Sequence, residues 1–527
     1  MKQIDLSSIA LGIELGSTRI KAVLIDRHHK TLASGSHNWE NRYINGLYTY
    51  SLEDIRTGLQ TAYADLKADF ALKFGQKLSV IGSIGISGMM HGYVVLDKTD
   101  NLLVPSRTWR CANAQSAAKD LTGLFDYPIP ARWSIAHLYQ AILDGEKHVK
   151  DIAYQTTLAG LVHYWLTGER VLGIGDVSGM FPIDLASKRY HPRMLAQFDA
   201  ILAAQKLPYA LKDIFPRIAV AGENAGHLTK EGALLLDPTG DLVAGIAFCP
   251  PEGDAGTGMA ATNSIRRETA NISAGTSVFA MLVLEKELSK VYPEIDLVTT
   301  PKGDLVAMVH CNNCTSDIDA WAMLFSELGA LYGIKNNDKQ LFEKLFMLSL
   351  QADPDCGDVL SYNYVSGEHI THVDEGRPMV VRIPESKFTL ANFVRSLLYS
   401  SVATVKIGMD ILTVQERVTV RAINAHGGIF KTRGVMQKYL AAALNAPVTV
   451  RENAGEGGAW GMAMLAMYAL TGKNKPLEAY LDEDVFADEK TLTVQPEPQV
   501  VAGFAAYMQR YIKGLEAVQA AVTALKE

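Results

Sequence analysis

A short pattern of strand, glycine turn and strand occurs twice in this chain of 527 residues. The first copy spans Ile13–Leu24 around the turn Gly16-Ser17-Thr18. The second spans Ile272–Leu282 around Gly275-Thr276-Ser277, about 260 residues later. Two extended segments joined by small residues predict a β-hairpin. Two halves that open with the same hairpin predict a duplicated fold, which we divide into residues 1–265 and 266–527.

Strands and helices alternate along most of the chain. Ser51 can cap a helix over 51–64, where apolar residues recur at helical spacing, and residues 79–86 form an apolar strand. This order favours a layered α/β fold over separate all-α and all-β domains. The length is sufficient for two large domains, each with its own core.

Composition excludes several classes of partner. Hydrophobic residues make up 48% of the chain and charged residues 20%, with a net charge of −7 and no block of basic residues. These values argue against nucleic acid or an anionic membrane as the main partner. No uninterrupted apolar run is long enough for a membrane span. Five scattered cysteines suggest reduced thiols, and we therefore expect a cytoplasmic protein.

The first hairpin turn is a candidate phosphate site. The backbone N–H groups of Gly16, Ser17 and Thr18 could bind an anion, and Lys21 would add positive charge. Glu14, just before the turn, could hold a magnesium ion. Gly275 and Thr276 offer the same donors in the second turn. Plain hairpins with solvated polar residues are the alternative, and neither turn contains a P-loop sequence.

Asp254 lies in the glycine-rich segment Glu252-Gly253-Asp254-Ala255-Gly256, after an expected strand over 243–248. A carboxylate in such a loop suits general-base chemistry on a hydroxyl. A helix-capping aspartate is the equal alternative at this point.

The pair Gly427-Gly428, with Lys431 close behind, follows an expected strand over 418–423. Open α/β sheets bind ligands at such strand ends, whereas a tight connection without a ligand is the alternative. Met90 and His91 follow another buried strand, where a histidine could bond a sugar hydroxyl. Trp109 and Arg110 could pack on a sugar and donate to it, although a surface contact is the simpler interpretation.

Cys311 and Cys314 flank two asparagines. A four-ligand zinc site would be incomplete there, so we interpret both residues as buried thiols at a strand end.

Taken in order, these motifs resemble the FGGY carbohydrate kinases over roughly residues 9–470, and among them the ketopentose kinases. The matching segments are Glu14 to Ser17 with Lys21, Ser87 to Gly92, Glu252 to Asp254, Gly275 to Ser277, Gly427 to Lys431 and Glu456 to Ala463. Two positions depart from the family pattern. Glu14 stands where the family has aspartate, and residues 109–113 lack the acid of the family's sugar site.

The resemblance implies a duplicated actin-like (ribonuclease H-like) ATPase fold, with two lobes and a catalytic cleft. It implies an ATP-dependent kinase with Asp254 as catalytic base. Sugar would contact Met90, His91, Trp109, Arg110 and Asp254 in the N-terminal lobe. ATP would meet Gly16, Ser17, Thr18, Lys21, Gly275, Thr276, Gly427, Gly428 and Lys431, with Mg²⁺ near Glu14.

Several alternatives stay open from the sequence. The acceptor could be a ketopentose, L-ribulose, another sugar, a polyol or a sugar acid. A non-catalytic actin-like module that binds ATP or senses sugar is the alternative of another class. The expected partners are a small sugar and ATP, without nucleic acid or membrane, and a homodimer is one assembly open to such a chain.

Overall fold

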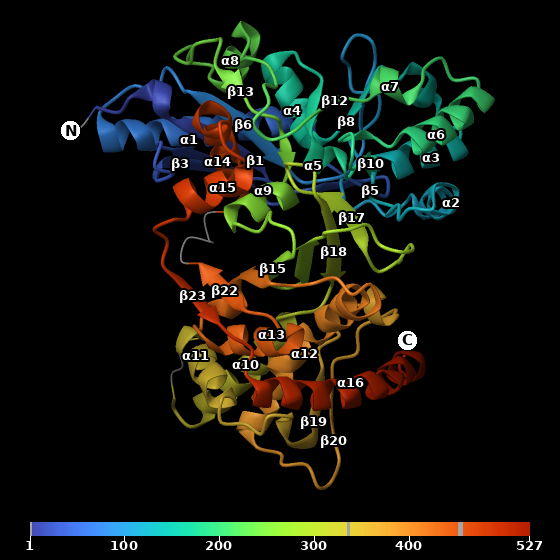
Figure 1. Ribbon diagram of the computed structural model, residues 1–527, viewed down its shortest axis with the longest axis vertical. Coiled ribbons are helices and arrows are strands. Elements are labelled where there is room, and N and C mark those ends of the chain that lie inside the picture. The colour runs from blue at the N-terminus through green and yellow to red at the C-terminus, as the bar shows by residue number, and fades with distance from the viewer. Residues whose placement is uncertain (1–2, 335–337, 452–456, 527) are drawn as a thin grey trace. The chain divides into compact units, whose positions relative to one another are not determined.

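The computed structural model describes residues 3–334, 338–451 and 457–526. The chain divides into two compact units (Figure 1). Unit 1 comprises Met1–Ile265, Leu297–Val306 and Glu456–Asp488, and unit 2 comprises Arg266–Asp296, Ala307–Gly455 and Glu489–Glu527. The division expected from the sequence, 1–265 and 266–527, therefore differs in two later segments that belong to unit 1.

The central sheet of unit 1 has the strand order β13-β6-β1-β2-β3, and β14 also pairs with β6. The bounds are β1 (Ala10–Leu15), β2 (Arg19–Ile25), β3 (Thr31–Asn38), β6 (Ser83–Gly88), β13 (Ala247–Phe248) and β14 (Glu252–Gly253). β1 and β2 are antiparallel, which confirms the first hairpin. β6 runs parallel to both β1 and β14, so these three strands end at one edge of the sheet.

Helices cover both faces of this sheet. α1 (Leu52–Phe74), capped by Ser51 as expected, and α4 (Leu158–Thr167) contribute to a core with the strands. α14 (Gly457–Met467) packs on β1, β2, β6 and α9 (Asp254–Ala261). An ideal Cβ on Gly12 of β1 would lie 2.1 Å from the carbonyl oxygen of Ala459 in α14. This close contact between backbones explains why a segment so late in the chain belongs to unit 1.

The main sheet of unit 2 has the order β17-β18-β16-β15-β21-β22-β23. Its bounds are β15 (Thr269–Ala274), β16 (Val278–Val283), β17 (Asp296–Thr299), β18 (Leu305–Cys311), β21 (Ala422–His426), β22 (Val448–Arg451) and β23 (Thr491–Val494). β15 and β16 form the second antiparallel hairpin, and β15 runs parallel to β21. The order β18-β16-β15-β21-β22 repeats the order β3-β2-β1-β6-β13 of the first sheet, which confirms the duplication.

The helices of unit 2 include one long apolar helix. α12 (Leu390–Asp410) packs on α11 (Asp338–Ser349), α13 (Val435–Leu444) and β16, and α16 (Pro498–Ala524) packs on α13. Among the described residues, the segment Leu390–Gln415 is the one candidate membrane span by length and composition. However, 72% of its most apolar window is buried inside the protein, as in a core helix.

Further elements complete the two units. They are β4 (Arg42–Ile44), β5 (Leu47–Thr49), β7 (Val94–Leu96), α2 (Gln115–Phe125), α3 (Ser134–Leu143), β8 (Tyr154–Thr156), β9 (Val171–Gly173), α5 (Ile174–Val177), β10 (Ile183–Asp184), β11 (Arg189–Tyr190), α6 (Pro192–Ala204), α7 (Leu211–Ile214), β12 (Arg217–Ala219), α8 (Lys230–Leu236), α10 (Ser316–Leu331), β19 (Val359–Tyr362), β20 (Met379–Arg382) and α15 (Leu477–Tyr480).

Three expected strands begin later than the sequence pattern indicated. The strand expected over 79–86 is β6, which starts at Ser83. The strand expected over 243–248 is confined to β13, because Gly245 has a positive φ of 93° and the chain turns there. The strand expected over 418–423 begins at Ala422, since Val418 still donates its N–H to Leu412 at the end of a helix.

Candidate active site

The site in unit 1 lies where β1, β6 and β14 end. These ends carry the turn at Gly16–Thr18, the segment Met89–His91 and Asp254, which begins α9. Ligands of open α/β sheets bind at the carboxyl ends of the strands. The structure thus brings together three segments that are separated by up to about 240 positions.

Asp254 is held by two backbone donors. Its Oδ1 accepts hydrogen bonds from the N–H of Met90, at 3.3 Å, and of Ala255, at 3.0 Å. The side chain itself is exposed, while poorly solvated surroundings raise its pKa. Gly253, not Asp254, is the N-cap residue of α9, so the capping alternative does not describe this side chain.

Glu14 lies at the same edge, half-buried near the end of β1. Burial, followed by the nearby charge of Asp254, raises the pKa of Glu14 to about 7. A divalent cation bound to the Glu14 carboxylate would offset the repulsion between Glu14 and Asp254, so Glu14 fits the role of a magnesium ligand. Among the described residues, no group of three or more His, Cys, Asp or Glu side chains could hold a metal by itself. Phosphate oxygens and water would therefore supply the other ligands.

The first turn contacts Trp109, one of the expected sugar-site residues, and Met89, which was not among them. The hydroxyl of Ser17 lies 3.2 Å from the sulfur of Met89, and the indole N–H of Trp109 donates to the same hydroxyl at 3.3 Å. The turn is closed by a bond from Gly16 N–H to the carbonyl of Arg19. Lys21 stands opposite Glu14 in the hairpin register.

His91, which follows Met90 at this edge of the sheet, is neutral at pH 7. Its Nδ1–H donates to the carbonyl of Gly179 at 3.2 Å, and its ring stacks on Trp133 with centroids 6.4 Å apart. Burial lowers the pKa of His91 to about 3, so the ring can accept a hydrogen bond at neutral pH through its other nitrogen. Arg110, in contrast, places its guanidinium over the ring of Tyr48, 4.3 Å from the centroid.

Four residues of this region were not found from the sequence. Arg132 is close enough to lower the pKa of both His91 and Asp254. Trp133 is fully buried beside His91, and Asp176 and Glu252 are buried behind Asp254. Glu252 could have been noticed, because it lies in the segment Glu252-Gly253-Asp254 that the sequence singled out. The other three lie in segments without a recognisable pattern.

The second turn, in unit 2, is built like the first. Gly275 N–H donates to the carbonyl of Ser277, and the carbonyls of Gly275 and Thr276 accept from Thr315 and Cys314. Gly427 packs against Ala274, the residue just before this turn, since an ideal Cβ on Gly427 would lie 1.9 Å from the carbonyl oxygen of Ala274. Its φ of 120° also requires glycine.

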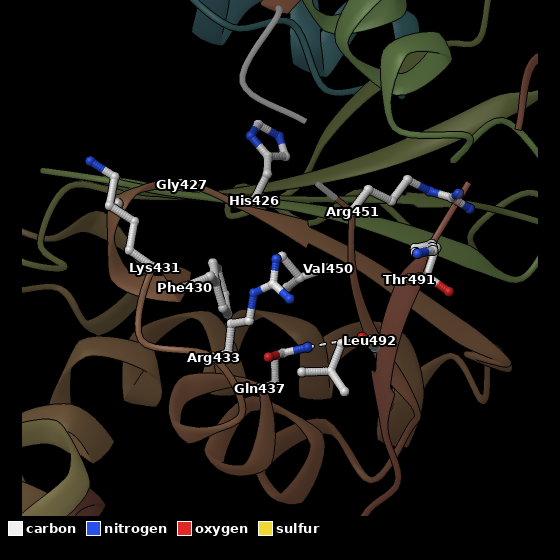
Figure 2. A pocket seen from close by; sticks show the side chains of 12 residues that line it. His426, Gly427, Phe430, Lys431, Arg433, Gln437, Val450, Arg451, Thr491 and Leu492 are labelled. Atoms are coloured by element: carbon white, nitrogen blue, oxygen red, sulfur yellow. Dashed lines mark hydrogen bonds between the residues drawn. The ribbon is translucent and has the colours of Figure 1, made fainter. Parts of the chain in front are cut away.

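Two pockets of unit 2 share Gly428 and Lys431. One, of ≈ 760 Å³, is lined by Lys431, Arg433 and Arg451 together with Phe430, Gln437 and Val450 (Figure 2). Lys490 is a further cationic residue of its lining. The other, of ≈ 830 Å³, is lined by Thr315, Ile318, Phe342, Phe346 and Ile429. Thr315 links this second pocket to the turn at Gly275.

Cys311 and Cys314 are both buried and free, in agreement with their interpretation as thiols at a strand end. The matching segment Glu456 to Ala463 lies in α14 from Gly457 onward, and Glu456 lies outside the described residues.

Comparison with known proteins adds independent evidence. Residues 9–128 match the N-terminal domain of the FGGY family of carbohydrate kinases, and residues 270–470 match the C-terminal domain. Together these matches cover more than half of the chain. The protein belongs to the FGGY family of carbohydrate kinases. It is thus an ATP-dependent sugar kinase, which confirms the resemblance seen in the sequence and leaves the non-catalytic alternative without support.

Named relatives include two xylulose kinases. One from Haemophilus influenzae is 22% identical over 96% of this chain and 99% of its own length. One from Klebsiella pneumoniae is 25% identical over 69% of this chain and 70% of its own length. The structure of a xylulose kinase from Lactobacillus acidophilus aligns with a TM-score of 0.78 at 17% identity, covering 98% of this chain and all of that one. This last likeness shows the fold, the actin-like ATPase fold of sugar kinases.

Proposed function

We propose that this kinase phosphorylates a terminal hydroxyl of a ketose, most suitably a ketopentose, with Asp254 as general base. The observation that supports this most is the bond between Met90 and Asp254. This bond joins the segment that resembles the ketopentose kinases to the carboxylate of Asp254. Asp254 is exposed, and its Oδ1 accepts hydrogen bonds from two backbone N–H groups. L-Ribulose is one such ketopentose, and other sugars, polyols and sugar acids are the alternative acceptors.

The reaction requires one proton transfer and one displacement. Asp254 accepts the proton of the acceptor hydroxyl as that oxygen bonds to the γ-phosphorus of ATP. The bond from this phosphorus to the bridging oxygen breaks, and ADP leaves. The N–H groups of Met90 and Ala255 keep the Asp254 carboxylate oriented. Because the base is already positioned before the reaction, the activation free energy is lower.

The acceptor would lie along Met90, His91 and Trp109. Neutral His91 can accept from one sugar hydroxyl, and the indole face of Trp109, 40% exposed, can pack on C–H groups. Arg110 lies against Tyr48 and would take part only if it left that ring.

ATP would be bound by residues of both units. We assign the adenosine to the pocket of Thr315, Phe342 and Phe346, because flat apolar side chains suit a purine and Thr315 leads to the turn at Gly275. Gly16, Ser17, Thr18, Lys21, Gly275 and Thr276 would meet the phosphates, with Gly427, Gly428 and Lys431 next to them. Glu14 would hold Mg²⁺, which neutralises phosphate charge when bound.

The test is release of ADP from Mg-ATP in the presence of ketopentoses, ketohexoses, polyols and sugar acids, each beside a control without acceptor. Strong stimulation by one ketopentose would support the proposal. Stimulation by a sugar acid or polyol alone would contradict the assigned acceptor class. We further expect the enzyme to act in the cytoplasm, where its five free cysteines stay reduced.

A further inference from the structure

A buried pair of carboxyl groups lies behind the proposed base. Glu252 and Asp176 are 1% and 0% exposed. They come from β14 and α5, two elements that pack directly on each other. Neither residue is needed to bind ATP or sugar in the proposed function, and an unused buried carboxyl pair is costly for a fold.

Glu252 ties the base loop to α5. Its Oε1 accepts from the N–H of Gly175 at 3.3 Å and its Oε2 from the N–H of Asp176 at 3.1 Å. Next to it, Gly173 N–H donates to the carbonyl of Pro251 at 2.7 Å. Ideal Cβ atoms on Gly173 and Gly175 would each lie 2.4 Å from a Glu252 oxygen, so the carboxylate fills this space completely.

Asp176 lies next to both Glu252 and Gly253. Its Oδ2 accepts from the hydroxyl of Thr157 at 2.6 Å. Its Oδ1 has no hydrogen-bond partner within the described part of the chain. This oxygen lies 3.3 Å from the ideal Cβ position of Gly253, which is also 2.1 Å from Cγ of Met90. The oxygen is therefore packed against the loop that presents Asp254.

The segment around Asp176 also contacts His91, a residue of the proposed sugar site. Asp176 accepts through its backbone carbonyl from Gly179 N–H, and the carbonyl of Gly179 accepts from His91 Nδ1. An ideal Cβ on Gly179 would lie 2.6 Å from that nitrogen. Residues 173–179 thus connect the base loop with the His91 turn.

We propose that Asp176 is a positioning residue for phosphoryl transfer, an inference that rests on the proposed function. Its buried carboxyl group, anchored by the Thr157 hydroxyl and lying next to Glu252, holds the Gly253–Asp254 loop and the His91 turn against α5. If both carboxyl groups became ionised, two buried negative charges would repel each other and displace the base loop.

The electrostatics of the pair agree with this geometry. Burial raises the pKa of Asp176 to about 8, and burial followed by the charge of Asp176 raises that of Glu252 to about 8. The titratable groups that face Asp176 are Glu252, Asp254 and Tyr154. At neutral pH the pair keeps a proton, and above about pH 8 it loses it, so activity should fall on the basic side.

Three variants separate positioning from mere stability. Asp176→Asn mimics the protonated acid and should keep kcat near neutral pH within about threefold, while the basic fall in activity disappears. Asp176→Ala should lower kcat at least about tenfold without changing KM for ATP. Thr157→Val removes the hydroxyl that favours the ionised carboxylate, and should move the basic fall upward by about 0.5 pH unit or more.

The matched control is Thr229→Val. Thr229 caps α8 by accepting from Gly232 N–H, as Thr157 caps α4 by accepting from Gly160 N–H, but Thr157 alone of the two donates to Asp176. The pH profile of kcat for the Thr229→Val variant should equal that of the wild type. Pentose-stimulated turnover with the same basic fall in Thr157→Val and Asp176→Asn as in the wild type would overturn this inference alone. Absence of transfer from the wild-type enzyme to any acceptor would instead overturn the proposed function, and this inference with it.

Discussion

The backbone N–H of Met90 donates a hydrogen bond to Oδ1 of Asp254, a residue 164 positions further along the chain. Parallel pairing of β6 with β14 makes this contact possible, because Gly88 stands opposite Gly253 at the end of both strands. The bond couples the orientation of the proposed base to the segment that would contact the sugar.

His91→Asn should lower kcat/KM for the acceptor at least about tenfold, while KM for ATP stays unchanged. Asparagine tolerates the positive φ of 69° at this position but cannot reach as far as the imidazole. Steady-state kinetics with each substrate varied checks this. The control is His372→Asn, an exposed histidine of unit 2 with a φ of 53°, which should behave like the wild type. Equal effects on both substrates would contradict a role for His91 in the sugar site.

The magnesium requirement should depend on pH. Because the pKa of Glu14 is raised to about 7, its carboxyl group is largely protonated below this pH and ionised above it. The Mg²⁺ concentration for half-maximal activity should therefore fall as pH rises from 6 to 8, by up to about tenfold per pH unit on the acidic side. Glu14→Gln should flatten this dependence. A requirement that does not change with pH in the wild type would remove Glu14 as a magnesium ligand.

Gly428→Ala tests the nucleotide site without disturbing the fold. An ideal Cβ at this position meets no atom within 4 Å, so the thermal melting temperature should change little. A ligand lying on Gly428 would meet the added methyl group, and KM for ATP should rise about tenfold, which corresponds to roughly 1.4 kcal/mol. The acceptor KM should stay constant. Unchanged ATP kinetics would place the nucleotide away from Gly428.

Gly12→Ala should destabilise unit 1 strongly. The new methyl group would lie 2.1 Å from the carbonyl oxygen of Ala459 and 2.3 Å from the nitrogen of Ala463, so β1 and α14 would have to separate. A loss of about 3 kcal/mol or more in the free energy of unfolding is expected. Gly123→Ala in α2 is the control, since its Cβ has open space and should stabilise the helix by up to about 1 kcal/mol. Equal stability of the two variants would contradict the packing of α14 on β1.

The hairpins, the duplication and the position of Asp254 could be predicted because they depend on local sequence. A glycine-hydroxyl turn between apolar runs is visible in the two segments Gly16–Thr18 and Gly275–Ser277. The return of residues 456–488 to unit 1 could not be predicted, because it depends on the contact of Gly12 with α14 rather than on any local pattern.

Part of the site was invisible in the sequence for the same reason. Asp176 and Trp133 contact Gly253 and His91, which are far away in the chain, and nothing in their own segments marks them. The contact of Trp109 with Ser17 likewise arises only when the loop after β7 meets the first turn. In contrast, Met90 and His91 could be recognised because they continue directly from a buried strand.

Asp254 is the residue on which the proposed phosphoryl transfer depends most directly. The measurement is phosphoryl transfer by Asp254→Asn with the best acceptor, together with ATP binding by calorimetry on the same sample. We predict that kcat falls at least about 10³-fold, since asparagine cannot accept the proton, while the Kd for ATP stays within about twofold. Turnover comparable to that of the wild type would show that another group is the base.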